Sequence, residues 1–109
     1  MKVLVADVAR TATLFAVQET TLVHTLGEAR AALRAHSFDL LVTGARFDDS
    51  RMFDLLREVR ADARHKDLRI VCVIPSGTLE IACRALDATA VLEEDFATWV
   101  AELTSAGTL

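Results

Sequence analysis

Short, nearly unbroken runs of apolar residues recur along the chain, and they constrain its fold more than any other feature. The runs lie at residues 3–6, 21–23, 38–42, 70–74 and 90–92. Apolar runs of this length, without regular polar alternation, are typical of strands that are buried on both faces of a parallel sheet. We therefore predict one strand at each of these positions.

Amphipathic helical patterns separate the apolar runs. Apolar residues recur at three- and four-residue spacing over 52–59, 79–86 and 96–103, which predicts helices with one buried face. A further helix is predicted from residue 25 to about residue 36. The segment 11–19 has only a weak helical pattern, so we expect the first helix to be short or missing.

Three helix starts have candidate N-caps. Thr25 and Glu28 match the capping box, in which a hydroxyl and a carboxylate satisfy free amides of the first turn. Asp95 precedes the last helix, and Asp49 or Ser50 precedes the helix over 52–59. Aspartate and serine are preferred at such positions because their side chains accept hydrogen bonds from the first turn.

Strands that alternate with helices predict an α/β fold, a three-layer αβα sandwich around a five-stranded parallel sheet. The 109 residues fit one domain, 1–109. In open parallel sheets, functional sites lie beyond the carboxyl ends of the strands. The residues of interest are therefore Asp7, Val8, and those at 44–50, 74–77 and 93–95.

Composition excludes several classes of function. The net charge of −4 argues against direct binding of nucleic acid, which requires a clustered basic face. No apolar run is long enough to cross a membrane. Cys72 and Cys83 form no C-x-x-C motif and fit a reducing, cytoplasmic location. With no glycine-rich phosphate loop or nucleophile motif, we expect neither an enzyme nor a cofactor.

Five segments together resemble the receiver domains of bacterial two-component response regulators. They are KVLVAD at 2–7, EARAAL at 28–33, FDLLV at 38–42, FDLLREVR at 53–60 and ALDATAVLEEDF at 85–96. The resemblance covers essentially the whole chain and depends on the order and spacing of the segments. It implies a receiver-like (flavodoxin-like) (βα)5 fold and a role in signal transduction.

The resemblance also implies that the phosphorylation site of the family is degenerate here. The acid pair that holds Mg²⁺ falls on Asp7 and Val8, the phosphoacceptor aspartate on Gly44, the hydroxyl residue on Ile74 and the lysine on Glu94. Glycine cannot accept a phosphoryl group, because acceptance requires a carboxylate nucleophile. The chain is therefore expected to be a pseudo-receiver that acts through protein partners, a second copy of itself included, without phosphorylation.

Two other interpretations of the residues that follow the strands stay open. Asp7, Asp48 and Asp49 are candidates for a residual divalent-cation site, although acids at 48 and 49 are more typical of a polar loop and a helix cap. The space left at Gly44 is a candidate pocket for a small ligand.

Receivers commonly bind partners through the face formed by the fourth helix, the fifth strand and the fifth helix. The resemblance places Arg84, Asp87, Glu93 and Trp99 on that face. Trp99 continues the apolar stripe of the last helix, so it is either a core residue or an anchor for a partner. Two groups are expected to be solvated. One is His65 in a polar loop, and the other is the set of arginines at helical spacing: Arg57, Arg60 and Arg64, and Arg30 and Arg34.

Overall fold

The computed structural model describes residues 2–7 and 19–105. Its five parallel strands confirm the predicted sheet. They are β1 (Lys2–Ala6), β2 (Glu19–Val23), β3 (Leu40–Gly44), β4 (Arg69–Ile74) and β5 (Thr89–Leu92), in the spatial order β2-β1-β3-β4-β5. This is the order of flavodoxin-like folds, in which the direction of strand addition reverses beside β1.

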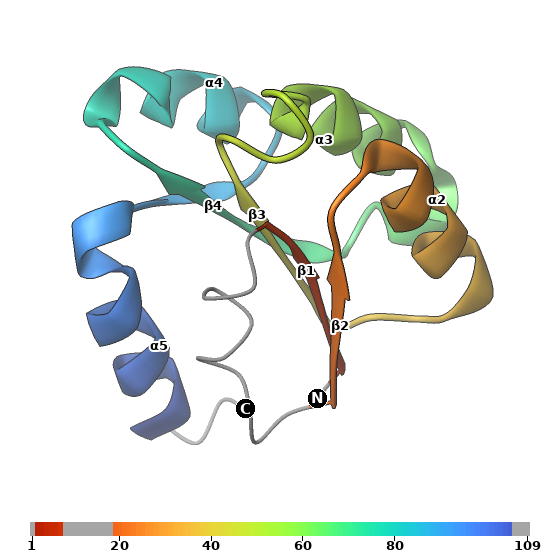
Figure 1. Cartoon of the computed structure of the whole chain (residues 1–109), viewed down its shortest axis with the longest axis horizontal. Coiled ribbons are helices and arrows are strands. Elements are labelled where there is room, and N and C mark those ends of the chain that lie inside the picture. The colour runs from red at the N-terminus through yellow and green to blue at the C-terminus, as the bar shows by residue number, and fades with distance from the viewer. Residues whose placement is uncertain (1, 8–18, 106–109) are drawn as a thin grey trace.

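Helices cover both faces of the sheet. They are α2 (Leu26–Ala35), α3 (Met52–Ala61), α4 (Glu80–Ala85) and α5 (Phe96–Ser105), with 3₁₀ turns η1 (Ala63–His65), η2 (Gly77–Leu79) and η3 (Glu93–Asp95). Figure 1 shows α2, α3 and α4 on one face and α5 on the other. The weak helical segment at 11–19 and the functional position Val8 lie outside the described residues, except for Glu19, which begins β2.

Successive strand residues pack alternately into two apolar layers, one on each face of the sheet. Leu4, Leu41, Ile70 and Cys72 pack under α2, α3 and α4, and the intervening residues Val3, Val42 and Val71 pack on the α5 side. Because successive side chains of a strand point to opposite faces, a strand that is buried on both faces must be apolar throughout. This requirement explains the unbroken runs in the sequence.

The structure corrects some boundaries and caps. The third strand begins at Leu40, because Phe38 and Asp39 precede the ladder and the Asp39 carboxylate accepts a hydrogen bond from the Lys2 amide at 2.8 Å. The capping box of Thr25 and Glu28 is confirmed. The predicted caps of α3 are wrong, because Arg51 occupies the cap position without a side-chain bond.

Arg60 is not part of a solvated arginine face. It is half-buried at the end of α3, where its guanidinium donates to the carbonyls of Leu86 and Asp87 at 2.9 and 2.8 Å, and to those of His65 and Lys66 at 3.3 and 3.1 Å. These carbonyls belong to the turn after α4 and to the loop before β4. The Arg60 side chain thus links both the turn after α4 and the loop before β4 to the end of α3.

The hydrogen bonds of Arg60 predict that its substitution destabilises the fold more than substitution of Arg57 on the same helix. Arg60→Gln should lower the free energy of unfolding by about 2 kcal/mol, because several carbonyls lose a charged donor. Arg57→Gln should change it by less than about 1 kcal/mol, since Arg57 makes only an exposed ion pair with Asp54. Urea unfolding of both variants measures the difference, and equal stabilities would contradict it.

None of the described helices combines the length and the apolar character that crossing a bilayer requires.

Candidate functional site

The ends of β1, β3 and β4 bring three of the predicted site residues to one edge of the sheet. Asp7 follows β1, while Gly44 and Ile74 are the last residues of β3 and β4. The register pairs Ala6 with Thr43 and Gly44 with Val73, so these ends lie side by side. Gly44 is buried and Ile74 is only 1% exposed. The apolar side chain of Ile74 offers no hydrogen bond at this edge.

The half-buried side chain of Asp7 lies directly over Gly44. A Cβ atom built on Gly44 would overlap the Cγ and both carboxylate oxygens of Asp7. The space that a longer residue would need at position 44 is thus already filled by a carboxylate. Glycine is required by this close approach and not by an unusual backbone conformation.

Glu94 lies on η3, after β5, and its side chain is exposed. A carboxylate at this position adds negative charge near the edge where Asp7 lies, whereas a lysine would offset it. Ser76, in the turn after β4, pairs its hydroxyl with that of Thr78 at 2.8 Å. Of the positions that the resemblance assigns to the phosphorylation site, the described ones thus hold two acids, a glycine and an apolar side chain, and none holds a cation.

Asp48 has a structural partner that its sequence position does not reveal. Its Oδ2 accepts a hydrogen bond of 2.7 Å from the amide of Leu26, the first residue of α2. A carboxylate at a helix N-terminus satisfies a free amide and interacts favourably with the helix dipole. Asp48 thus fastens the loop after β3 to the start of α2.

The same loop has an unusual backbone. Asp48, Asp49 and Ser50 have consecutive positive φ angles of 43°, 55° and 70°. The flanking Phe47 is buried, donates its amide to the carbonyl of Gly44 at 3.0 Å and accepts from the amide of Arg51 at 2.8 Å. Non-glycine residues adopt this left-handed conformation at a cost, which the anchored ends of the turn offset.

The three aspartates of the proposed cation site are not gathered into a ligand set. Asp48 is directed to α2, and Asp49 is exposed on the left-handed turn. Within residues 2–7 and 19–105, no three His, Cys, Asp or Glu side chains are arranged to hold a metal ion.

The contact between Asp7 and Gly44 predicts an energetic coupling. Gly44→Ala should lower the free energy of unfolding by about 1–3 kcal/mol, because the new methyl group overlaps the Asp7 carboxylate. In the Asp7→Ala background the same substitution should cost much less. A double-mutant cycle from urea unfolding measures the coupling, and an equal cost in both backgrounds would contradict it.

The residues of the predicted partner surface lie around α4, β5 and α5. Arg84 is exposed and pairs with Glu80 at 2.6 Å, Asp87 is exposed in the turn after α4, and Glu93 is exposed on η3. Trp99 is half-buried and stacks on Phe96, with ring centroids 5.8 Å apart. Trp99 thus packs partly against the core and is partly exposed to solvent, so it is compatible with both interpretations, core residue and partner anchor.

A groove of about 410 Å³ lies beside Trp99. Its apolar lining includes Ala90, Leu92 and Trp99, while its charged lining consists of Glu80, Asp95 and Glu102. Arg84, Asp87 and Glu93 are not among the residues that line it. Sequence reasoning found the tryptophan and interpreted Asp95 as a helix cap, but it missed Glu80 and Glu102, because their spacing follows no motif.

The two cysteines are unsuited to nucleophilic chemistry. Cys72 on β4 and Cys83 on α4 are both fully buried. Burial raises the pKa of both thiols, so neither is a ready thiolate.

His65 departs from the expectation of a solvated side chain. It is half-buried in η1, and its Nε2 atom is buried without a hydrogen-bond partner among the described residues. His65 is the last residue of η1, and the polar sequence around it does not indicate that its ring is half-buried.

Comparison with known proteins gives matches of structure but not of sequence. No protein-family profile matches the chain, and neither does any curated protein. The phosphorylated cyanobacterial phytochrome response regulator RcpA matches with a TM-score of 0.75 and 16% identity, over 91% of this chain and 87% of that one. The chain has the fold of response-regulator receiver domains.

Two further solved structures agree. The response regulatory domain of protein MrkE from Klebsiella pneumoniae matches with a TM-score of 0.72 and 15% identity, over 97% of each chain. A sensor protein from Polaromonas sp. JS666 matches with a TM-score of 0.78 and 22% identity, over 96% of this chain and 94% of that one.

Proposed function

We propose that the chain is a pseudo-receiver, a signalling module of two-component type that acts through protein contact without being phosphorylated. The observation that carries this proposal is the pairing of Gly44 with Asp7. The position that corresponds to the phosphoacceptor has no side chain, and a carboxylate from the neighbouring strand occupies the space above it. No nucleophile stands where a receiver requires one.

Electrostatics supports the same conclusion. A transferred phosphoryl group brings about two negative charges, which a metal ion and a lysine offset in receivers. At the position that the resemblance assigns to the lysine this chain has the exposed carboxylate of Glu94, and at the hydroxyl position it has the apolar Ile74. A phosphate here would therefore meet repulsion from Asp7 and Glu94. The proposed activity includes no catalytic step and no cofactor.

The surface of α4, β5 and α5 is the proposed site of contact. It offers the half-buried ring of Trp99 beside a groove that is lined by apolar and acidic side chains. Tryptophan in a partly apolar depression is a common anchor of protein interfaces. Arg84 on α4, Asp87 in the turn after α4 and Glu93 on η3 are exposed on or next to these elements and belong to the proposed surface. A second copy of the chain is one partner that this surface could take.

Binding of a small ligand in place of the phosphate is the alternative, and the structure favours it less. The carboxylate of Asp7 fills the space above Gly44 that such a ligand would need.

Amide NMR spectra with Mg²⁺ alone, and with Mg²⁺ and beryllofluoride, test the loss of phosphorylation. Beryllofluoride mimics an acyl phosphate, so a receiver with an intact aspartate serves as the positive control. We expect no change in this protein beyond that caused by Mg²⁺, because no carboxylate at position 44 can hold the mimic. Changes concentrated at Asp7, Asp48 and Ser76 would show that another acceptor has replaced Gly44, and would overturn the proposal.

Surface variants test the site of contact. Glu93→Lys and Trp99→Ala should each reduce the amount of partner protein that co-purifies with the chain from cells that express it naturally. Arg57→Gln, which alters an exposed ion pair on α3, should not. Thermal melting of each variant controls for folding. If the same proteins are recovered in the same amounts with all three variants, contact through this face is ruled out.

A further inference from the structure

The groove beside Trp99 follows the outer edge of the sheet. β5 is the last strand in the order β2-β1-β3-β4-β5, so within the described residues it pairs with β4 alone. Ala90 and Leu92, which pack in the layer of α4, and Val91, which packs in the layer of α5, all line the groove. Because residues from both faces of β5 line it, the groove lies along the edge of this strand, between α4 and α5.

The backbone of this edge can pair with a further strand. Among the described residues, no backbone hydrogen bond joins residues 89–91 to a segment other than β4. An edge strand presents a row of unpaired amides and carbonyls, which an extended segment of another chain can satisfy. The groove therefore offers main-chain partners as well as side chains.

One side of α5 forms a wall of the groove. Asp95, Thr98, Trp99 and Glu102 line it, and their spacing of three, four and seven residues places them on one side of a helix. This stripe is roughly 10 Å long, which corresponds to about three residues of an extended segment. The half-buried ring of Trp99 thus lies between two exposed carboxylates.

The carboxylates of this stripe have no basic partner. None of the residues that line the groove is a lysine, arginine or histidine. Glu80, on the α4 side, pairs with Arg84 at 2.6 Å. Within residues 2–7 and 19–105, no ion pair or hydrogen bond involves the side chain of Asp95 or Glu102. Two negative charges are thus left without local compensation.

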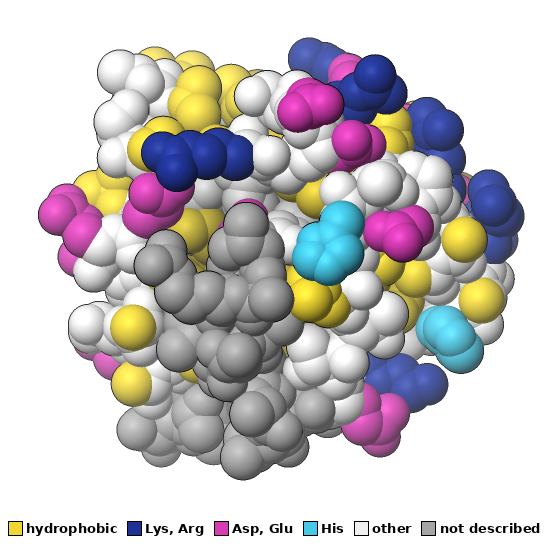
Figure 2. All heavy atoms as spheres, viewed as in Figure 1, with side chains coloured by type: hydrophobic (Ala, Val, Ile, Leu, Met, Phe, Trp, Pro, Cys, Tyr) yellow, Lys and Arg dark blue, Asp and Glu magenta, His cyan; other side chains and the backbone are white. Residues whose placement is uncertain are grey.

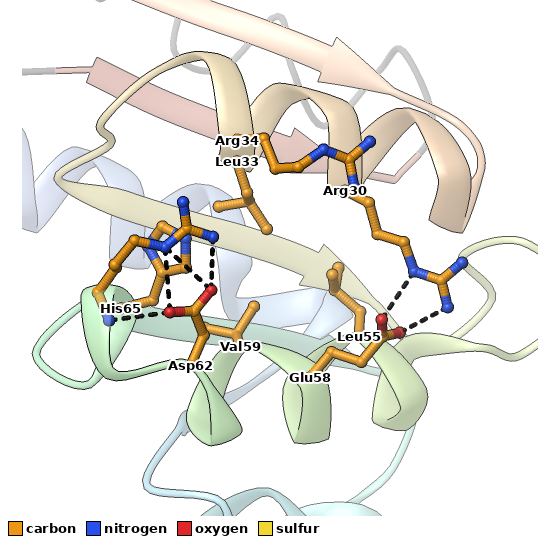
Figure 3. Close-up of a pocket in the computed structure, with 9 residues that line it drawn as sticks. Arg30, Leu33, Arg34, Leu55, Glu58, Val59, Asp62 and His65 are labelled. Atoms are coloured by element: carbon orange, nitrogen blue, oxygen red, sulfur yellow. Dashed lines mark hydrogen bonds and ion pairs between the residues drawn. The ribbon is translucent and has the colours of Figure 1, made fainter.

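Acids on the other side of the molecule are compensated. On the face that Figure 2 shows, Lys and Arg side chains gather mainly along α2 and α3. There Arg30 donates hydrogen bonds of 2.7 and 3.0 Å to Glu58, and Arg64 binds Asp62 with a closest contact of 2.7 Å (Figure 3). The groove differs from this region because its cations must come from a partner.

We propose that the groove binds an extended, cationic segment of a partner protein, which adds to the edge of β5. Backbone hydrogen bonds to residues 89–91 hold the segment, an apolar side chain packs on Trp99, and lysine or arginine side chains pair with Asp95 and Glu102. In strand addition the main-chain bonds give affinity, while side-chain contacts give specificity. This assignment rests on the proposed function, because it names the chemistry of the partner that the contact surface takes.

Charge disfavours a second copy of the chain as the occupant. A symmetric dimer formed through this groove would bring the acids of both grooves to one interface, and like charges across an interface are unfavourable. A cationic segment of a different protein instead brings opposite charges together.

Three peptides of about six residues, roughly 20 Å long when extended, test the assignment. One alternates lysine with leucine, one has glutamate in place of lysine, and one has serine in place of leucine. Trp99 is the only tryptophan and the chain has no tyrosine, so its fluorescence reports on the groove. We expect the lysine–leucine peptide to shift the emission saturably to shorter wavelength, because it covers the ring.

The other two peptides separate the contributions of charge and apolar contact. The lysine–serine peptide should bind at least about tenfold more weakly, because it buries no apolar side chain on Trp99. The glutamate–leucine peptide should not bind measurably, because it meets like charges. With the lysine–leucine peptide bound, NMR should show slower hydrogen exchange at amides of residues 89–91, since these gain carbonyl partners.

Charge-neutralising variants locate the contact. Asp95→Asn, which keeps a side chain suited to a helix cap, and Glu102→Gln should each weaken binding of the lysine–leucine peptide about two- to fivefold, as expected for exposed ion pairs. Asp67→Asn removes the same charge from an exposed loop before β4 and should leave binding unchanged. Thermal melting confirms that each variant is folded.

The proposal fails if the lysine–leucine peptide gives no saturable shift, if the glutamate–leucine peptide binds as tightly, or if Asp67→Asn weakens binding as much as Glu102→Gln. Binding without slower exchange in β5 would rule out strand addition. Co-purification with Trp99→Ala and Glu93→Lys tests the contact surface separately. If these variants lose the natural partner while the peptide does not bind, the surface stands and the chemistry assigned to the partner is wrong.

Discussion

The three central strands, β1, β3 and β4, have almost no exposed face, and the rest of the structure depends on this constraint. Their apolar side chains fill two separate layers, one under α2, α3 and α4 and one on the side of α5. Polar chemistry is therefore excluded from the middle of the sheet and confined to the ends of its strands. Asp7 and Gly44 meet at one such end.

The loops are held by a few long-range polar contacts. Asp48 joins the loop after β3 to the first amide of α2, across 22 positions of sequence. Arg60 joins the end of α3 to the turn after α4 and to the loop before β4. In each contact, one side chain makes hydrogen bonds with backbone amides or carbonyls that have no partner within a helix or strand. Such bonds are needed because an unpaired backbone group that is shielded from water is costly.

The strands and the capping box of α2 are predictable from the sequence because they depend on local patterns, the apolar runs and the spacing of Thr25 and Glu28. The assignment of the acceptor position to Gly44 comes from the resemblance to receivers alone and stays a prediction. The position of Asp7 above Gly44 is not predictable from local patterns, since it depends on the pairing of β1 with β3. The environments of Arg60 and His65 are also not predictable from local patterns. Arg60 bonds to carbonyls that are distant in sequence, and His65 lies in a short 3₁₀ turn.

The acidic groove beside Trp99 belongs to a larger asymmetry of charge. Residues 85–109 contain five acids and no lysine or arginine, so the other 84 residues hold 12 basic and 11 acidic side chains. Residues 85–109, which include β5 and α5, thus carry a net charge of −5, while the remainder carries a net charge of +1. The domain is an electric dipole, and such a distribution turns a molecule toward a cationic surface before contact. Mobile ions shorten the reach of this orienting field, so it acts over the greatest distance in dilute electrolyte.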